Sequence, residues 1–187
     1  TKVQSVDDYY LTHIDDITED SQTVTISIRC DTILDNWDKL DDSLKSDKYV
    51  PANGVILPTF RAVLRKGDTV YDIFSRVTRY SKIVTDCVYT VNYSSVYVKG
   101  INHLYEFSCG ELSGWMYRVN GVFPGYGCSK YVLKGGDVIE WVYTCDLGRD
   151  VGGEFGTAPS VENVYVQQKT DTYTFFYDKI AVVSPPK

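Results

Sequence analysis

Residues 110–148 read GELSGWMYRVNGVFPGYGCSKYVLKGGDVIEWVYTCDLG and hold the patterns that decide the fold. Alternating bulky side chains at residues 115–119 predict a strand, and the Asn-Gly pair at 120–121 directly after it is a strong turn signal. Residues 138–144, VIEWVYT, are β-branched or aromatic with a single charge, which predicts a strand covered on both faces. This stretch is therefore expected to form the core of a domain.

The segment between these two strands is a loop rich in glycine. Phe123 and Tyr126 stand there among glycine and proline, which permit sharp bends and favour an exposed tip. The chain also has 16 tyrosines, and tyrosine offers stiff, amphipathic contact area that suits recognition. The aromatic loop is therefore where a binding function is expected, although tyrosines also serve simply as strand residues.

Helices and strands are expected upstream of this core. Residues 24–28 alternate apolar and hydroxyl side chains, as a half-buried strand does. Apolar residues between positions 33 and 44 have helical spacing and predict a helix with Trp37 in the core. Thr69 and Asp72 match a capping box and predict a second, longer helix over residues 70–80.

Shorter β segments complete the pattern. Strands are expected at residues 54–57 and 60–64, broken by Pro58, and further strands between positions 83 and 107. One helix crossing a mixed sheet, with the first and last strands side by side at its centre, satisfies this order. The expected fold is α+β with a β-grasp-like sheet, one main helix, an additional short helix and extra C-terminal strands.

The two ends of the chain differ from this core. Residues 1–22 are polar and acidic and are expected to be an arm or linker, whereas residues 153–187 are expected to be a linker followed by extra strands. The domain is thus placed at residues 23–152. Because the chain starts at Thr1, we expect it to be part of a longer protein with other domains.

Composition argues against several functional classes. A net charge of −6 disfavours nucleic-acid binding, which needs clustered lysine and arginine. No apolar run reaches the length of a membrane span. Five cysteines without a C-x-x-C pair, and only two histidines, make a metal site an unfavourable interpretation. No serine, cysteine or carboxylate pair has an evident catalytic partner, so the chain is not expected to be an enzyme.

The motifs GELSGWMYRVNGVFPGYG and LKGGDVIEWVYTCDLGRD resemble a domain of unknown function that is common in secreted and surface proteins of Gram-positive bacteria. That domain is in turn similar to the C-terminal β-domain of transcobalamin and intrinsic factor. The resemblance covers about residues 24–152 and implies a β-grasp module of the soluble-ligand-binding type, located outside the cell or on its surface. A small-molecule or protein ligand is expected, and the B12 carriers imply cobalamin or another corrinoid.

The candidate ligand-binding residues lie in the strand at residues 115–119 and in the loop that follows it, namely Tyr117, Arg118, Asn120, Phe123 and Tyr126. Phe123 and Tyr126 would stack on a flat ligand such as a corrin or a sugar, with Arg118 and Asn120 as polar contacts. The alternative is a purely structural spacer or assembly domain whose aromatic residues are only core.

The cysteines allow two interpretations, namely buried thiols in a reducing compartment or two disulfides with one free thiol. In a β-grasp sheet, Cys30 and Cys145 close the ends of neighbouring parallel strands, so they are expected to be neighbours and a candidate disulfide. Cys109 and Cys128 are then the other candidate pair, and Cys87 is expected to be free.

Overall fold

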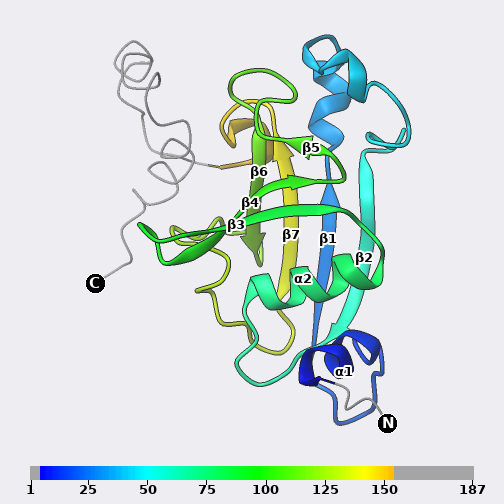
Figure 1. Cartoon of the computed structure of the whole chain (residues 1–187), viewed down its shortest axis with the longest axis vertical. Helices are drawn as coiled ribbons and strands as arrows, with labels where there is room; N and C mark the ends of the chain where they lie inside the picture. Colours follow the sequence, from blue (N-terminus) through cyan, green and yellow to red (C-terminus); the bar gives the residue numbers. More distant parts are fainter. Residues whose placement is uncertain (1–4, 154–187) are drawn as a thin grey trace.

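The computed structural model describes residues 5–153. Its main element is a four-stranded sheet in the order β2-β1-β7-β6, which runs vertically in Figure 1. The bounds of these strands are Thr23–Arg29 for β1, Val55–Val63 for β2, Gly114–Val119 for β6 and Val138–Thr144 for β7.

The first and last strands lie side by side at the centre of this sheet. β1 pairs in parallel with β7 from Thr25 opposite Val138 to Arg29 opposite Val142, and both outer strands pair antiparallel to their neighbours. A parallel pair needs a long crossover, which here includes a helix. The predicted α+β class and the predicted central pair of a β-grasp-like sheet are confirmed.

Helix α2, Val70–Tyr80, lies across one face of the four-stranded sheet (Figure 1). The Thr69 hydroxyl accepts from the Asp72 N–H, and the Asp72 carboxylate accepts from the Thr69 N–H, so the predicted capping box is present. Val70, Ile73, Phe74 and Val77 are completely buried. The apolar stripe read from the sequence is thus the face that packs on the sheet.

A smaller sheet covers the rest of this face. It contains β3 (Thr85–Thr90), β4 (Ser95–Ile101) and β5 (Leu104–Tyr105), and its strands run across those of the main sheet (Figure 1). The Trp115 Nε1–H donates to the Leu104 carbonyl at 2.8 Å, and the Tyr143 hydroxyl donates to the Tyr105 carbonyl at 2.7 Å. The two sheets are therefore joined by hydrogen bonds from buried aromatic residues.

Strand β2 and the segment before it differ from expectation. The chain continues through Pro58 as one strand, which is tolerated because β2 is an edge strand with irregular pairing to β1. The helix expected near residues 33–44 is instead two 3₁₀ segments, η1 (Asp31–Lys39) and η2 (Asp42–Leu44). Asn36 is not helical, and Trp37, expected in the core, is 37% exposed.

The N-terminal segment packs on the domain more closely than an acidic arm would. Residues Val6–Thr12 form helix α1, and Ile14 is only 1% exposed. The Ile14 carbonyl accepts from the Val63 N–H at 2.7 Å, which ties this segment to β2. At the other end, a short 3₁₀ segment, η3 (Arg149–Val151), follows β7. The expected C-terminal strands lie outside the described residues.

Candidate functional site: an aromatic cleft

A cleft opens between β4, β6, β7 and the loop after β6. Its empty volume is about 470 Å³, a figure that includes the open space at its mouth. The lining is almost entirely apolar and consists of Val96, Tyr97, Val98, Trp115, Met116, Tyr117, Phe123, Pro124, Tyr126, Gly127, Cys128 and Trp141. Three of the five predicted ligand-binding residues, Tyr117, Phe123 and Tyr126, are thus brought together in one cavity.

Tyr117 links strand β6 to the aromatic loop. Its hydroxyl donates to the Tyr126 carbonyl at 2.5 Å, so the loop is fixed to the strand that precedes it. The Tyr126 ring stacks on Tyr131 with centroids 5.7 Å apart, and the residue remains 49% exposed. The rim of the cleft therefore carries a stacked ring pair whose outer face is open to solvent.

The N-terminus of α2 supports the far end of this loop. The Val70 N–H donates to the Tyr131 carbonyl at 3.0 Å, and the Tyr71 N–H donates to the Cys128 carbonyl at 3.1 Å. These are first-turn donors that have no partner inside the helix. The Ser129 hydroxyl accepts from the Val96 N–H at 3.0 Å and joins the loop to β4. The cleft is therefore built on rigid elements on both sides.

Trp141 of β7 lies in the wall of the cleft. Its ring packs between Phe74, at a centroid distance of 4.6 Å, and Tyr117, at 5.5 Å. The residue is 3% exposed, yet its Nε1–H has no hydrogen-bond partner among the described residues. Burying such a donor without an acceptor costs about 1–3 kcal/mol. An acceptor on a molecule that enters the cleft could relieve this cost.

Arg118 and Asn120 are not among the lining residues. The Arg118 guanidinium forms two hydrogen bonds with the Glu140 carboxylate, at 2.7 and 2.8 Å, which together with the Glu140 charge raise its pKa despite burial. Asn120 donates to Asp137 at 2.9 Å and accepts from the Val138 N–H at 2.9 Å. These hydrogen bonds join the end of β6 to β7 and occupy both side chains outside the cleft.

The cysteine pairs differ from expectation. All five cysteines, each within residues 5–153, are free thiols. Cys109, not Cys30, is the cysteine that shifts the pKa of Cys145, and Cys87, not Cys109, is the one that raises the pKa of Cys128. The reason is the turn before β6, which brings Cys109 to the end of β7. Burial raises the pKa of Cys30 and of Cys128 to about 12, so both are inert as nucleophiles at neutral pH.

The β4 side of the cleft was missed by sequence reasoning. Val96, Tyr97 and Val98 read only as a short strand, and no local pattern says which sheet such a strand joins. Trp141 was assigned to the core, which is correct for its burial but overlooks its unpaired donor. The sequence signal for this buried donor was a tryptophan in the strand VIEWVYT, which was expected to be covered on both faces.

The described part of the chain contains neither a metal-binding cluster nor a membrane-spanning helix. Within residues 5–153, histidine, cysteine and carboxylate side chains form no group that could hold a metal ion. None of the helices described there has the length and apolar character needed to cross a membrane.

Comparison with known proteins gives one family match. Residues 67–145 match the model of the Domain of unknown function (DUF4430). The matched range of this chain contains α2, the smaller sheet, β6, the aromatic loop and β7. No curated protein matches the chain.

Two solved structures are similar at low identity. One is haptocorrin in complex with Cbi, with 12% identity and a TM-score of 0.46, over 68% of this chain and 26% of the haptocorrin chain. The other is a protein from Ruminococcus gnavus ATCC 29149 for which metal binding has been suggested, with 8% identity and a TM-score of 0.41. It is matched over 66% of this chain and 96% of its own length. The chain thus spans about a quarter of haptocorrin.

Proposed function

We propose that this domain is a non-catalytic binding module that takes a flat, largely apolar ring of its ligand into the aromatic cleft. The observation that carries the proposal is a cleft lined by aromatic side chains, one of which, Trp141, has a buried Nε1–H with no acceptor among the described residues. Binding sites of this kind combine apolar walls with a few polar groups that orient the ligand. The ligand class is therefore a planar ring system that carries a hydrogen-bond acceptor.

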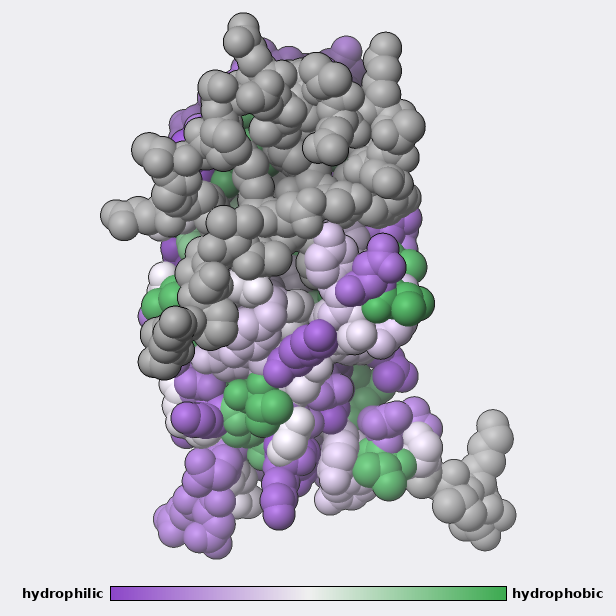
Figure 2. All heavy atoms as spheres, turned by 90° about the vertical axis from the view of Figure 1, so that its left-hand side faces the viewer, coloured by the Kyte–Doolittle hydropathy of each residue, from purple (hydrophilic) through white to green (hydrophobic). Residues whose placement is uncertain are grey.

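The described part of the face shown in Figure 2 favours a small ligand over a broad protein interface. Among the described residues visible in Figure 2, strongly hydrophobic side chains form separate spots between hydrophilic ones. Protein interfaces of the stable kind present a larger continuous apolar area.

A corrinoid is the specific ligand that the sequence motifs suggest. The proposal further relates this domain to the C-terminal β-domain of transcobalamin and intrinsic factor. It places the domain in an extracellular or surface protein of a Gram-positive bacterium, and the other domains of that protein complete the binding site. The visible spectrum of dicyanocobinamide during titration with the protein tests this version. A saturable spectral change supports it, and no change at high micromolar concentration removes the corrinoid from the proposal.

We expect Tyr126→Ala to weaken binding of the probe 1-anilinonaphthalene-8-sulfonate about tenfold. This probe offers planar rings and a sulfonate acceptor, and an aromatic contact contributes about 0.5–1.5 kcal/mol beyond burial. The control is Tyr89→Ala, because Tyr89 is 60% exposed on β3 and is not among the lining residues. The measurement is a fluorescence titration, with circular dichroism in the near ultraviolet to show that each variant is folded.

The alternative function, a structural spacer, predicts a different result. The burial of Trp115 and Tyr117 favours it, since both contribute to the core. If the folded protein binds no probe, or if both tyrosine variants bind it as the native chain does, the cleft is not a binding site and the spacer function is the better account.

A further inference from the structure

Cys109 and Cys145 occupy one end of the molecule, where the start of β6 meets the end of β7. Gly114 is paired with Thr144, and the Leu147 N–H donates to the Leu112 carbonyl at 3.0 Å. The segments that contain the two cysteines are therefore held together by backbone hydrogen bonds on both sides of the strand pair.

Ser113 fixes the orientation of the turn that carries Cys109. Its hydroxyl accepts from the Cys109 N–H at 3.1 Å and lies 3.0 Å from the hydroxyl of Tyr143, two residues before Cys145. The two thiols lie close enough for each to shift the pKa of the other. Cys109 is completely buried and Cys145 is 7% exposed, so solvent does not separate them.

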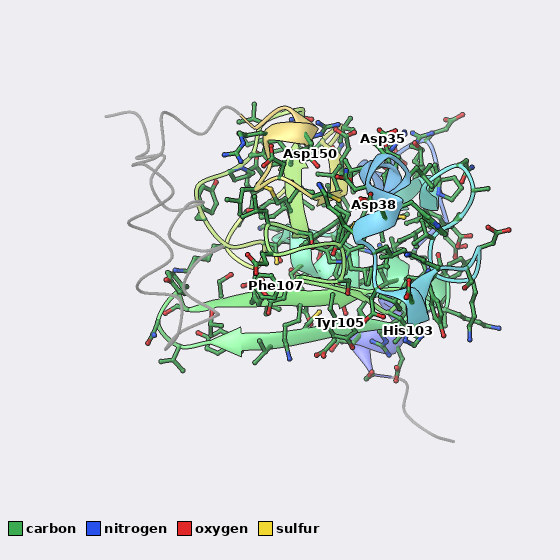
Figure 3. The ribbon with its side chains drawn as sticks, turned by 90° about the horizontal axis from the view of Figure 1, so that it is seen from above. Asp35, Asp38, His103, Tyr105, Phe107 and Asp150 are labelled. Carbon is green, nitrogen blue, oxygen red and sulfur yellow. The ribbon has the colours of Figure 1, made fainter. Side chains whose placement is uncertain are left out.

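The remaining surroundings of the pair come from η1 and η3. The Cys109 thiol donates to the Asn36 carbonyl at 3.4 Å, and the Cys145 thiol donates to the Thr32 hydroxyl at 3.7 Å. The charged groups that influence Cys109 are Lys39, Asp38 and Asp150, and the two aspartates lie at the same end of the molecule (Figure 3). The hydrogen bond to Cys145 lowers the pKa of Cys109, and the same bond raises that of Cys145.

We propose that Cys109 and Cys145 form a disulfide bond when the chain folds in the presence of a low-molecular-weight disulfide such as oxidised glutathione. The Cys109 and Cys145 thiols both contact η1, at Asn36 and Thr32, whereas the Cys128 thiol contacts Val96 of β4. The bond would close the β6–β7 segment, which contains the aromatic loop and most of the cleft wall. This inference is independent of ligand binding.

The reaction balances as two thiol–disulfide exchanges. One cysteine thiolate attacks a sulfur of oxidised glutathione, forms a mixed disulfide and releases one glutathione thiolate. The second cysteine loses its proton and attacks the protein sulfur of the mixed disulfide, which releases the second glutathione thiolate. The two protons pass to the released thiolates, so two electrons have moved from the cysteines to glutathione. Because Cys109 is buried in the folded chain, the first exchange takes place during folding.

The test is to refold the protein in a glutathione redox buffer, alkylate the remaining thiols after denaturation, and map the peptides by mass spectrometry. We expect a linked pair of peptides containing Cys109 and Cys145, with three alkylated cysteines left of the five. The sequence separation of 36 between Cys109 and Cys145 (145 − 109) predicts that reduction lowers the melting temperature by roughly 10 °C. Cys87→Ser, the control, retains the link, whereas Cys109→Ser and Cys145→Ser each lose it.

Two outcomes would overturn the proposal. One is five alkylated cysteines in correctly folded protein. The other is a different linked pair, such as Cys30 with Cys145 or Cys87 with Cys128. If Cys109→Ser does not fold, the peptide map of the native chain decides the matter without it.

Discussion

Asp68→Ala is expected to lower the free energy of unfolding by about 3–5 kcal/mol, because it leaves a buried arginine without its partner. Asp68 and Arg76 have side chains that are 5% and 12% exposed, and their carboxylate oxygen and guanidinium nitrogen are 2.6 Å apart. Burial opposes the charge of Arg76, but the hydrogen bond and charge of Asp68 raise its pKa overall. The same carboxylate oxygen accepts from the Arg65 N–H at 2.8 Å.

This ion pair lies beside the elements that support the cleft. The Asp68 carbonyl accepts from the Leu133 N–H at 2.9 Å, next to the bonds that join the first turn of α2 to the aromatic loop. Urea denaturation measures the loss, and Asp86→Ala is the matched control. Asp86 and Lys99 form a half-exposed pair at 3.7 Å, so its loss should cost less than about 1 kcal/mol. Equal losses of unfolding free energy for the two variants would show that the buried Asp68–Arg76 pair stabilises the fold no more than the Asp86–Lys99 pair does.

Gly54→Ala is expected to lower the free energy of unfolding by about 2–5 kcal/mol, through backbone strain and a steric clash. Gly54 has a φ of +66°, and a Cβ placed there would lie 2.4 Å from the Cα of Asp31. The neighbour is backbone, so it cannot rotate away. The Gly54 carbonyl also accepts from the Cys30 N–H at 2.7 Å, which fixes the distance between the two segments.

Gly67→Ala separates the two contributions. Gly67 has a φ of +85° but nothing within 4 Å of an added Cβ, so only the backbone strain of about 1–2 kcal/mol is expected. Thermal or urea unfolding of both variants gives the difference. A Gly54→Ala variant no less stable than Gly67→Ala would mean that the close approach to Asp31 is absent.

Much of the main sheet could be predicted from local patterns. The strands containing residues 24–28 and 138–144 and the helix after Thr69 follow from periodicity and capping, and their adjacency follows from chain order. Pro58 was misleading because a proline breaks an inner strand but not an irregular edge strand. The η1 segment was misleading because helical spacing does not distinguish a 3₁₀ segment with an interruption at Asn36 from an α-helix.

The candidate site was predictable only in part. Phe123 and Tyr126 were found because glycine and proline mark a loop, and Tyr117 because it precedes that loop. The β4 wall depends on how a second sheet packs over the first, which no local pattern encodes. Which cysteines meet also depends on the turn before β6, where Ser113 and not strand order sets the position of Cys109.

The central claim is that the cleft binds a ring ligand that the Trp141 indole contacts, and the ¹H–¹⁵N spectrum of the three tryptophan indoles tests it most directly. Trp37 is exposed and is not among the lining residues, so it serves as the internal control, whereas Trp115 itself lines the cleft. We predict that titration with 1-anilinonaphthalene-8-sulfonate moves the Trp141 resonance, which Trp141→Phe identifies, and leaves that of Trp37 in place. A Trp141 resonance that does not move while the probe is bound would contradict the account.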